Sequence, residues 1–134
     1  MKYYLDTNIV IYFIKGKYPA LISHFSKIPR QSVVIPEIAA AEIEYGARKS
    51  QNYESTVAKY RLFLDSFEHI SFSGEAARCY GKIRADMERK GTPIDPKDLI
   101  IAAIVMAENG TLITHNTKEF GRIEGLRIED WTEE

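Results

Sequence analysis

Cysteine is nearly absent from this sequence, and neither sign of charge is in excess. The 134 residues include one cysteine, Cys79, which excludes an internal disulfide and any zinc site built on several cysteines. The three histidines, His24, His69 and His115, are too scattered to indicate a histidine zinc site. With 18 basic and 19 acidic residues the net charge is −1. Binding of a nucleic acid would therefore need local basic patches or a metal ion.

Long hydrophobic runs are missing as well. The longest, residues 99–107, has nine residues, whereas a membrane-spanning helix needs roughly 20. Asp6 follows the first residues too soon for a secretory signal. The hydrophobic share of 45% is enough for one buried core. We therefore expect a soluble, cytoplasmic protein that forms a single domain over residues 1–134, without membrane association.

Short apolar segments alternate with longer helical patterns along the chain. Strands are predicted at residues 2–5, 32–35, 69–72, 111–114 and 126–128, and helices at 7–15, 19–28, 37–50, 54–67, 74–91 and from Pro96 to a stop at Gly110. The strands show almost no alternation of apolar and polar residues, which is typical of parallel strands buried on both faces. The pattern therefore predicts an α/β fold in which helices cover both faces of a parallel sheet.

Three carboxylates lie where such a fold would turn them inward. Asp6 ends the first strand, Glu42 interrupts an apolar run from Ile38 to Ile43, and Asp98 lies in the first turn of a helix. Burying an acid among apolar residues costs several kcal/mol unless something pairs with it. No matching buried base is evident, so the three acids together indicate a divalent cation.

The order of the elements predicts that these acids meet. In an open parallel sheet, ligands bind beyond the carboxyl ends of the strands. Asp6 follows the first strand, residues 114–116 follow the fourth, and the helices that carry Glu42 and Asp98 begin on the same side. Oxygen ligands suit Mg²⁺ or Mn²⁺. One or two such ions would serve phosphodiester hydrolysis, since they neutralise the phosphate and draw a polyanion to an acidic pocket.

Each acid also has a simpler explanation. Asp6 could cap the first helix, and Asp98 could face the positive end of its own helix dipole. Glu42 could lie on the solvated face that Glu44 indicates, although apolar residues surround much of its position. These neighbours form two stripes, Ile38, Ala41 and Tyr45, and Ala39, Ile43 and Gly46. The basic residues of helix 74–91 are more typical of a solvated face than of an RNA-binding surface.

Four segments, taken together, resemble the PIN-domain ribonucleases and, within them, the VapC-type toxins of toxin–antitoxin pairs. The segments are Leu5-Asp6-Thr7-Asn8-Ile9, residues 36–47 around Glu42, residues 91–103 around Asp98, and residues 112–120. The closing residues 123–131, which end at Trp131, are also similar to the end of this family. The resemblance spans nearly the whole chain, in the order of the family.

The resemblance implies a three-layer α/β/α sandwich with a parallel sheet of four or five strands, and cleavage of RNA that depends on Mg²⁺ or Mn²⁺. Asp6, Glu42 and Asp98 fall on the three acidic positions that bind metal and catalyse. Thr7 and Asn8 fall on positions that support the first acid, and Thr114 on the polar residue after the fourth strand. A cation-activated water would attack in line, giving a 5′-phosphate and a 3′-hydroxyl.

The chain departs from the family pattern at two positions. The fourth acidic position of many PIN domains is Asn116 here, and either its amide or the carboxylate of Glu119 could take that place. Asp95 stands where relatives commonly have glycine, and could act only as a helix cap.

The resemblance also implies partners. A VapB-type antitoxin would cover the groove near the first four helices, and the toxin would form a homodimer or a toxin–antitoxin hetero-oligomer. Structured RNA is the expected substrate, with tRNA the leading candidate. We expect RNA contacts from four basic residues, Lys15, Lys17, Arg48 and Lys49. An aromatic group, Tyr12, Phe13, Tyr18 and Phe25, could form the antitoxin interface or pack internally.

Two other functions compete with this interpretation. A phosphatase of the haloacid-dehalogenase type needs Asp-x-Asp after the first strand, and this chain has Asp6-Thr7-Asn8. A PIN-like module that only binds RNA or protein is the remaining alternative. Retention of all three acids speaks against it, because a pure binder gains nothing from three charges in one pocket.

Overall fold

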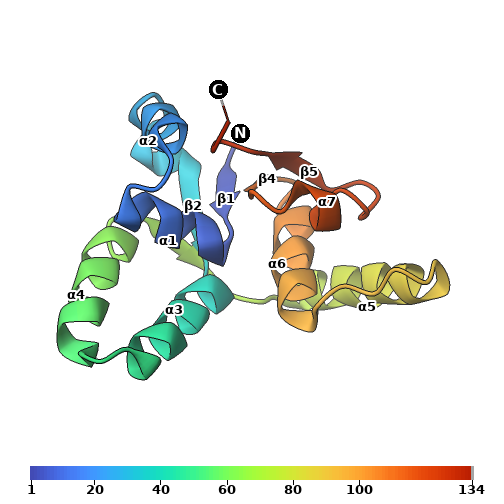
Figure 1. Ribbon diagram of the computed structural model, residues 1–134. Coiled ribbons are helices and arrows are strands. Elements are labelled where there is room, and N and C mark those ends of the chain that lie inside the picture. Colours follow the sequence, from blue (N-terminus) through green and yellow to red (C-terminus); the bar gives the residue numbers. More distant parts are fainter. Residues whose placement is uncertain (134) are drawn as a thin grey trace.

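Five short strands form one parallel sheet in the computed structural model, which describes residues 1–133 (Figure 1). They are β1 (Tyr3–Leu5), β2 (Val33–Pro36), β3 (Glu68–Ile70), β4 (Thr111–Ile113) and β5 (Arg127–Glu129). Their order across the sheet is β3-β2-β1-β4-β5, and every neighbouring pair is parallel. The register sets Tyr4 beside Val34 on one side and Leu112 on the other. The prediction of a parallel sheet is confirmed, with the upper of the two expected strand numbers.

Helices cover both faces of this sheet, as Figure 1 shows. On one side lie α1 (Thr7–Lys15), α2 (Pro19–Ser26), α3 (Glu37–Lys49) and α4 (Tyr53–Leu64), and on the other α5 (Gly74–Arg89), α6 (Pro96–Ala107) and the short α7 (Thr117–Phe120). A single turn of 3₁₀ helix, Arg30–Ser32, precedes β2. The expected α/β/α sandwich is therefore confirmed. Among residues 1–133, no helix combines the length and the apolarity that crossing a membrane requires.

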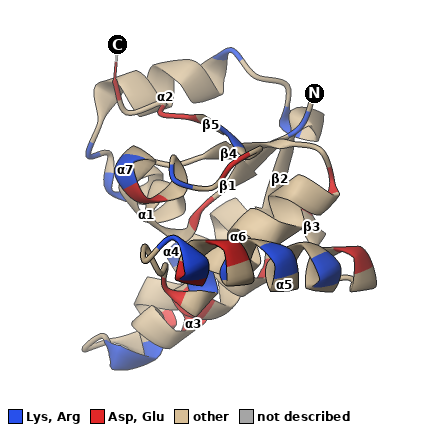
Figure 2. Cartoon of the chain, turned by 90° about the vertical axis from the view of Figure 1, so that its right-hand side faces the viewer, with Lys and Arg blue, Asp and Glu red and all other residues tan. Residues whose placement is uncertain are grey.

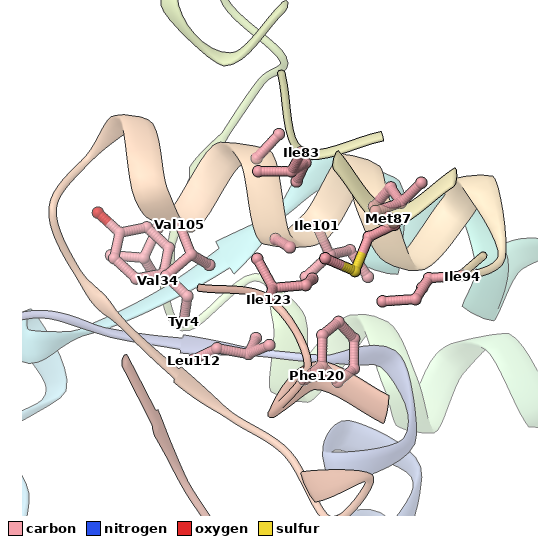
Figure 3. Close-up of a cluster of buried hydrophobic side chains, with 13 residues drawn as sticks. Tyr4, Val34, Ile83, Met87, Ile94, Ile101, Val105, Leu112, Phe120 and Ile123 are labelled. Carbon is pink, nitrogen blue, oxygen red and sulfur yellow. The ribbon is translucent and has the colours of Figure 1, made fainter. Parts of the chain in front are cut away.

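Successive residues of the three central strands, β2, β1 and β4, enter the two cores alternately. Tyr4 and Leu112 face the core beneath α5 and α6, where Met87, Phe120 and Ile123 pack against them (Figure 3). Their strand neighbours, Leu5, Ile35 and Ile113, face the second core with α1, α2 and α4. Because both faces are covered, the residues of β1, β2 and β4 are apolar except for Thr111, which explains why these strands lack a period of two.

The helix boundaries agree with the sequence where glycine supplies a left-handed residue. Gly16 ends α1 with φ of 64°. The predicted stop at Gly110 is wrong, since α6 ends at Ala107 and the left-handed residue is Asn109, with φ of 56°. Gly110 is needed for another reason: a Cβ at this position would collide with the Tyr4 ring.

Other ends differ by a few residues. The predicted helices that reach residues 28, 67 and 91 end at Ser26, Leu64 and Arg89, and α7 has no counterpart among the predicted elements. Side chains just beyond the helices still pack inward, because Ile28 and Phe67 both contact the second core. The apolar pattern therefore continued past the hydrogen-bonded turns and lengthened the predicted helices.

The aromatic residues of the first two helices pack mainly inside the protein. The Phe13 ring lies 4.6 Å from the Phe25 ring and 4.9 Å from the Phe63 ring of α4. Tyr12 and Tyr18 contact each other at 5.2 Å. All of them are partly buried against the second core, so part of each ring packs internally and the rest stays exposed.

Candidate active site

The sheet order creates a crevice at one strand end. The chain runs from β1 to β2 on one side, whereas β4 joins β1 from the other side, so the connections diverge at the β1–β4 pair. Open α/β sheets bind their ligands at such a point, beyond the carboxyl ends of the strands. Asp6 follows β1 and Thr114 follows β4, so the two side chains meet at this crevice.

Asp6 is held rigidly in a buried position, with 6% of its surface exposed. One oxygen, Oδ1, accepts a hydrogen bond from the Ile9 backbone N–H at 3.0 Å, which caps α1. The other, Oδ2, accepts one from the Thr114 hydroxyl at 2.6 Å. Burial raises the pKa of Asp6, the Thr114 and backbone donors counteract it, and the nearby Glu42 adds to the rise. The capping role is therefore real, but it uses only one of the two oxygens.

Glu42 points into the same crevice from α3, and its side chain is only 23% exposed. The Thr7 hydroxyl donates a 2.7 Å hydrogen bond to Glu42 Oε1, and Lys97 Nζ lies 3.5 Å from Oε2. The solvated position that the sequence left open for Glu42 is not what the structure shows. Lys97, which precedes Asp98, is a site residue that the sequence did not single out, since a lysine in a first helical turn carries no signal of its own.

Asp98 lies against Glu119, which α7 carries. The Asp98 pKa rises from 3.8 to about 8, first through burial, then through a hydrogen bond and repulsion with Glu119, and also through the charges of Asp95 and Asp6. Two carboxyls can hydrogen-bond to each other only when one is protonated. With both ionised, Glu119 Oε1 is a buried oxygen without a donor among residues 1–133.

The remaining predicted support residues have different positions. Asn8 and Asn116 are both exposed. Asn8 contributes a backbone N–H toward Asp6, and the Asn116 backbone N–H donates to the Thr114 hydroxyl at 3.0 Å. Asp95 caps α6 by accepting from the Lys97 N–H at 2.8 Å. Of the two candidates for the fourth acidic position, Glu119 is the one in contact with another acid of the site.

This donor set suits a hard divalent cation. Buried carboxylates with raised pKa and an orphaned Glu119 oxygen are groups that a cation would stabilise. In residues 1–133, however, no three acids, histidines or cysteines already stand together as a metal site.

Two hollows in the surface lie beside Glu42. One hollow of about 480 Å³ is lined by Thr7, Ala41, Glu42, Tyr45, Gly46, Lys49 and Lys97. A second, of about 270 Å³, shares Glu42 and Gly46 with it and includes Lys15. Two of the predicted RNA contacts, Lys15 and Lys49, therefore line hollows that Glu42 also lines.

The other two predicted RNA contacts lie elsewhere. The Arg48 guanidinium stacks 3.8 Å from the centre of the Tyr53 ring, and Lys17 Nζ lies 4.8 Å from that of Tyr12. Neither lines the two hollows. The basic residues of α5 alternate with acids along its surface, as Figure 2 shows, and form salt bridges such as Arg78–Glu75. Alternating charges of this kind agree with a solvated face.

Comparison with known proteins gives one consistent result. The profile of the PIN domain matches residues 3–126. The chain is 39% identical over 132 residues to ribonuclease VapC2 of Rickettsia felis, covering 98% of both proteins. It is 36% identical over 132 residues to the tRNA(fMet)-specific endonuclease VapC of Shigella flexneri, covering 98% of this chain and 99% of that protein.

A solved structure agrees with these relatives. VapBC2 from Rickettsia felis, bound to a DNA fragment from its promoter, includes a chain that superposes with a TM-score of 0.91 at 37% identity. The superposition covers 98% of this chain and 99% of that chain. The likeness therefore extends over nearly all of the sequence and is not confined to the crevice.

Proposed function

The chain belongs to the PIN-domain family, and we propose that it is the ribonuclease toxin of a VapBC-type toxin–antitoxin pair, which cleaves structured RNA with the help of Mg²⁺ or Mn²⁺. The observation that carries the proposal is the gathering of Asp6, Glu42, Asp98 and Glu119 at the β1–β4 crevice. The curated relatives are named ribonucleases, and one of them is named for a tRNA, so tRNA is the substrate that we would test first.

The cation would be held by Asp6 and Asp98, with Glu42 and Glu119 as further carboxylates, and one or two ions would fit this charge. When bound, it would supply a Lewis acid that neutralises the scissile phosphate and lowers the pKa of a water. Glu119 takes the fourth place in this proposal because it contacts Asp98, whereas Asn116 is exposed.

The protein's own residues position these groups. Thr114 and the start of α1 hold both oxygens of Asp6, so this carboxylate cannot turn away. The Thr7 hydroxyl donates to one oxygen of Glu42. Lys97, at the mouth of the crevice, offers a positive charge to a phosphate oxygen when it leaves Glu42. Since no ribose hydroxyl is needed as nucleophile, the products would carry a 5′-phosphate and a 3′-hydroxyl.

The test is cleavage of a total tRNA pool by protein freed of antitoxin, with Mg²⁺, Mn²⁺ or EDTA. We expect discrete fragments with 5′-phosphates that EDTA abolishes and that the Asp98→Asn variant does not produce. Glu75→Gln is the matched control, because it neutralises a surface acid of α5 that pairs only with Arg78 among the described salt bridges. Fragments that persist in Asp98→Asn would contradict the assigned site.

Cation binding has a readout that does not depend on cleavage. Binding to the folded form alone raises the melting temperature, by RT ln(1 + [L]/Kd) in free energy. Mn²⁺ should therefore stabilise the wild type and Glu75→Gln, and much less so Asp98→Asn. If the folded protein binds RNA but neither binds Mn²⁺ nor cleaves the RNA, the result would support the alternative of a non-catalytic RNA- or protein-binding module.

The proposed partner is a VapB-type antitoxin that covers the crevice, and the proposed site of action is the cytoplasm, where tRNA is found. Co-expression with the neighbouring gene product and light scattering of the purified material would test the partner. The same measurement distinguishes a homodimer from a toxin–antitoxin hetero-oligomer.

A further inference from the structure

Tyr45 is an aromatic side chain that the core does not use. It is 64% exposed, although the sequence placed it on an apolar stripe of α3. Glu42, Tyr45 and Lys49 follow one another at spacings of three and four residues, so they lie on one face of the helix. This face lines the hollow of about 480 Å³ that includes Glu42.

The surroundings of Tyr45 suit a planar, negatively charged ligand. Lys49 Nζ lies 4.6 Å from the centre of the Tyr45 ring, and Lys97 Nζ lies on the other wall, 3.5 Å from Glu42. Gly46, the next residue, also lines the hollow, and a Cβ there would meet no atom within 4 Å apart from its chain neighbours. An exposed ring and two lysines thus line one hollow together with Glu42.

We propose that Tyr45 stacks on an unpaired base of the RNA substrate close to the scissile phosphate, while Lys49 contacts the neighbouring phosphate. The proposal rests on the proposed function and narrows its substrate to RNA that is single-stranded next to the cut. Base-paired nucleotides stack on one another and offer no open face to a side chain, so a duplex would not occupy this ring.

RNA fits this surface better than a protein segment does. A nucleotide pairs an aromatic face with an anion, which matches the combination of Tyr45 with Lys49. A protein anchor of the usual kind fills a desolvated apolar pocket, whereas Glu42, Lys49 and Lys97 line this hollow. A protein contact at Tyr45 is nonetheless one outcome of the test below.

The first part of the test measures binding in the Asp98→Asn background with Mg²⁺, so that cleavage does not interfere. The probes are a fluorescein-labelled, unstructured RNA of about 12 nucleotides, the same strand in a duplex, and the same backbone with abasic nucleotides. Adding Tyr45→Ala should weaken binding of the single strand by roughly 5- to 50-fold and leave the duplex and abasic probes unchanged. Tyr45→Phe should bind like the parent.

The second part measures cleavage of the tRNA pool by the single variants Tyr45→Ala and Tyr45→Phe. We expect Tyr45→Ala to raise KM more than it lowers kcat, because stacking acts on binding. Phe72→Ala is the control, since Phe72 is an exposed aromatic residue that packs on Tyr80 and does not line the hollow. Unchanged melting temperatures would show that every variant is folded.

The proposal would be overturned if Tyr45→Ala bound each of the three probes as tightly as its parent does. Cleavage by Tyr45→Ala at the wild-type rate would then show that the proposed function holds although the stacking proposal is wrong. If Tyr45→Ala binds RNA normally but no longer co-purifies with the antitoxin, Tyr45 is a protein contact and the proposal is also wrong. If the wild type neither cuts nor binds RNA, the proposed function itself fails.

Discussion

Replacing Asp98 with asparagine should stabilise the protein at neutral and alkaline pH when divalent cations are removed. In the folded protein the Asp98 pKa is about 8, against 3.8 for the ordinary carboxyl, with burial as the main cause and Glu119 as the next. Between these two pH values the folded protein holds a proton that the unfolded chain has released. Stability therefore falls as the pH rises from about 4 to about 8. The asparagine side chain does not titrate, so the variant does not lose stability in this way as the pH rises.

The magnitude follows from the shift. Each pH unit corresponds to 1.36 kcal/mol, so a rise from 3.8 to about 8 sets an upper limit of roughly 5–6 kcal/mol at pH 8. Asp98 is only half-buried, and screening by solvent reduces this to about 2–3 kcal/mol. The charge also interacts favourably with the start of α6, worth roughly 0.3–1 kcal/mol, which the variant loses. A net gain of about 1–2 kcal/mol remains.

Urea unfolding in EDTA at several pH values between 4 and 8 measures this effect. The quantity of interest is the free energy of unfolding of Asp98→Asn minus that of the wild type, which cancels the other titrating groups. It should be near zero at pH 4 and reach about 1–2 kcal/mol at pH 8. A difference that stays constant with pH, or a variant less stable than the wild type at pH 8, would refute the assignment of the raised pKa to this pair.

Four further substitutions test hydrogen bonding, helix propensity and packing. Thr114→Val removes the hydroxyl that donates to buried Asp6, so urea unfolding should show a loss of about 1–3 kcal/mol and cleavage should fall. Gly46→Ala should raise stability by about 0.5–1 kcal/mol, as should Gly81→Ala on the remote α5, because a Cβ meets no atom within 4 Å at either position; thermal melting checks both. Gly110→Ala should instead cost roughly 1–3 kcal/mol in the same measurement, since its Cβ collides with a buried ring.

Much of the fold follows from local signals in the sequence. Apolar runs gave all five strands to within two residues, and caps such as Asp95 and Gly16 gave helix ends. The meeting of Asp6 with Thr114 was predictable because parallel strands end at one edge. Contacts between helices that are distant in the sequence were not predictable, since no sequence signal indicates that Glu42 contacts Lys97. Tyr45 shows the same limit, because helical spacing cannot tell which of two neighbouring stripes the protein buries.

The position of Glu119, the proposed fourth carboxylate, depends on the short helix α7. Counting along the sequence sets Asn116 at the family's acidic position, and a four-residue helix such as α7 is too short to give a periodic signal. In the structure Phe120 is buried in the core beneath α6 (Figure 3), and this anchor turns the preceding residue, Glu119, toward Asp98. The charge that Asn116 lacks is thus supplied three residues later. A glutamate in contact with the third acid is a better candidate ligand than an amide exposed at the rim.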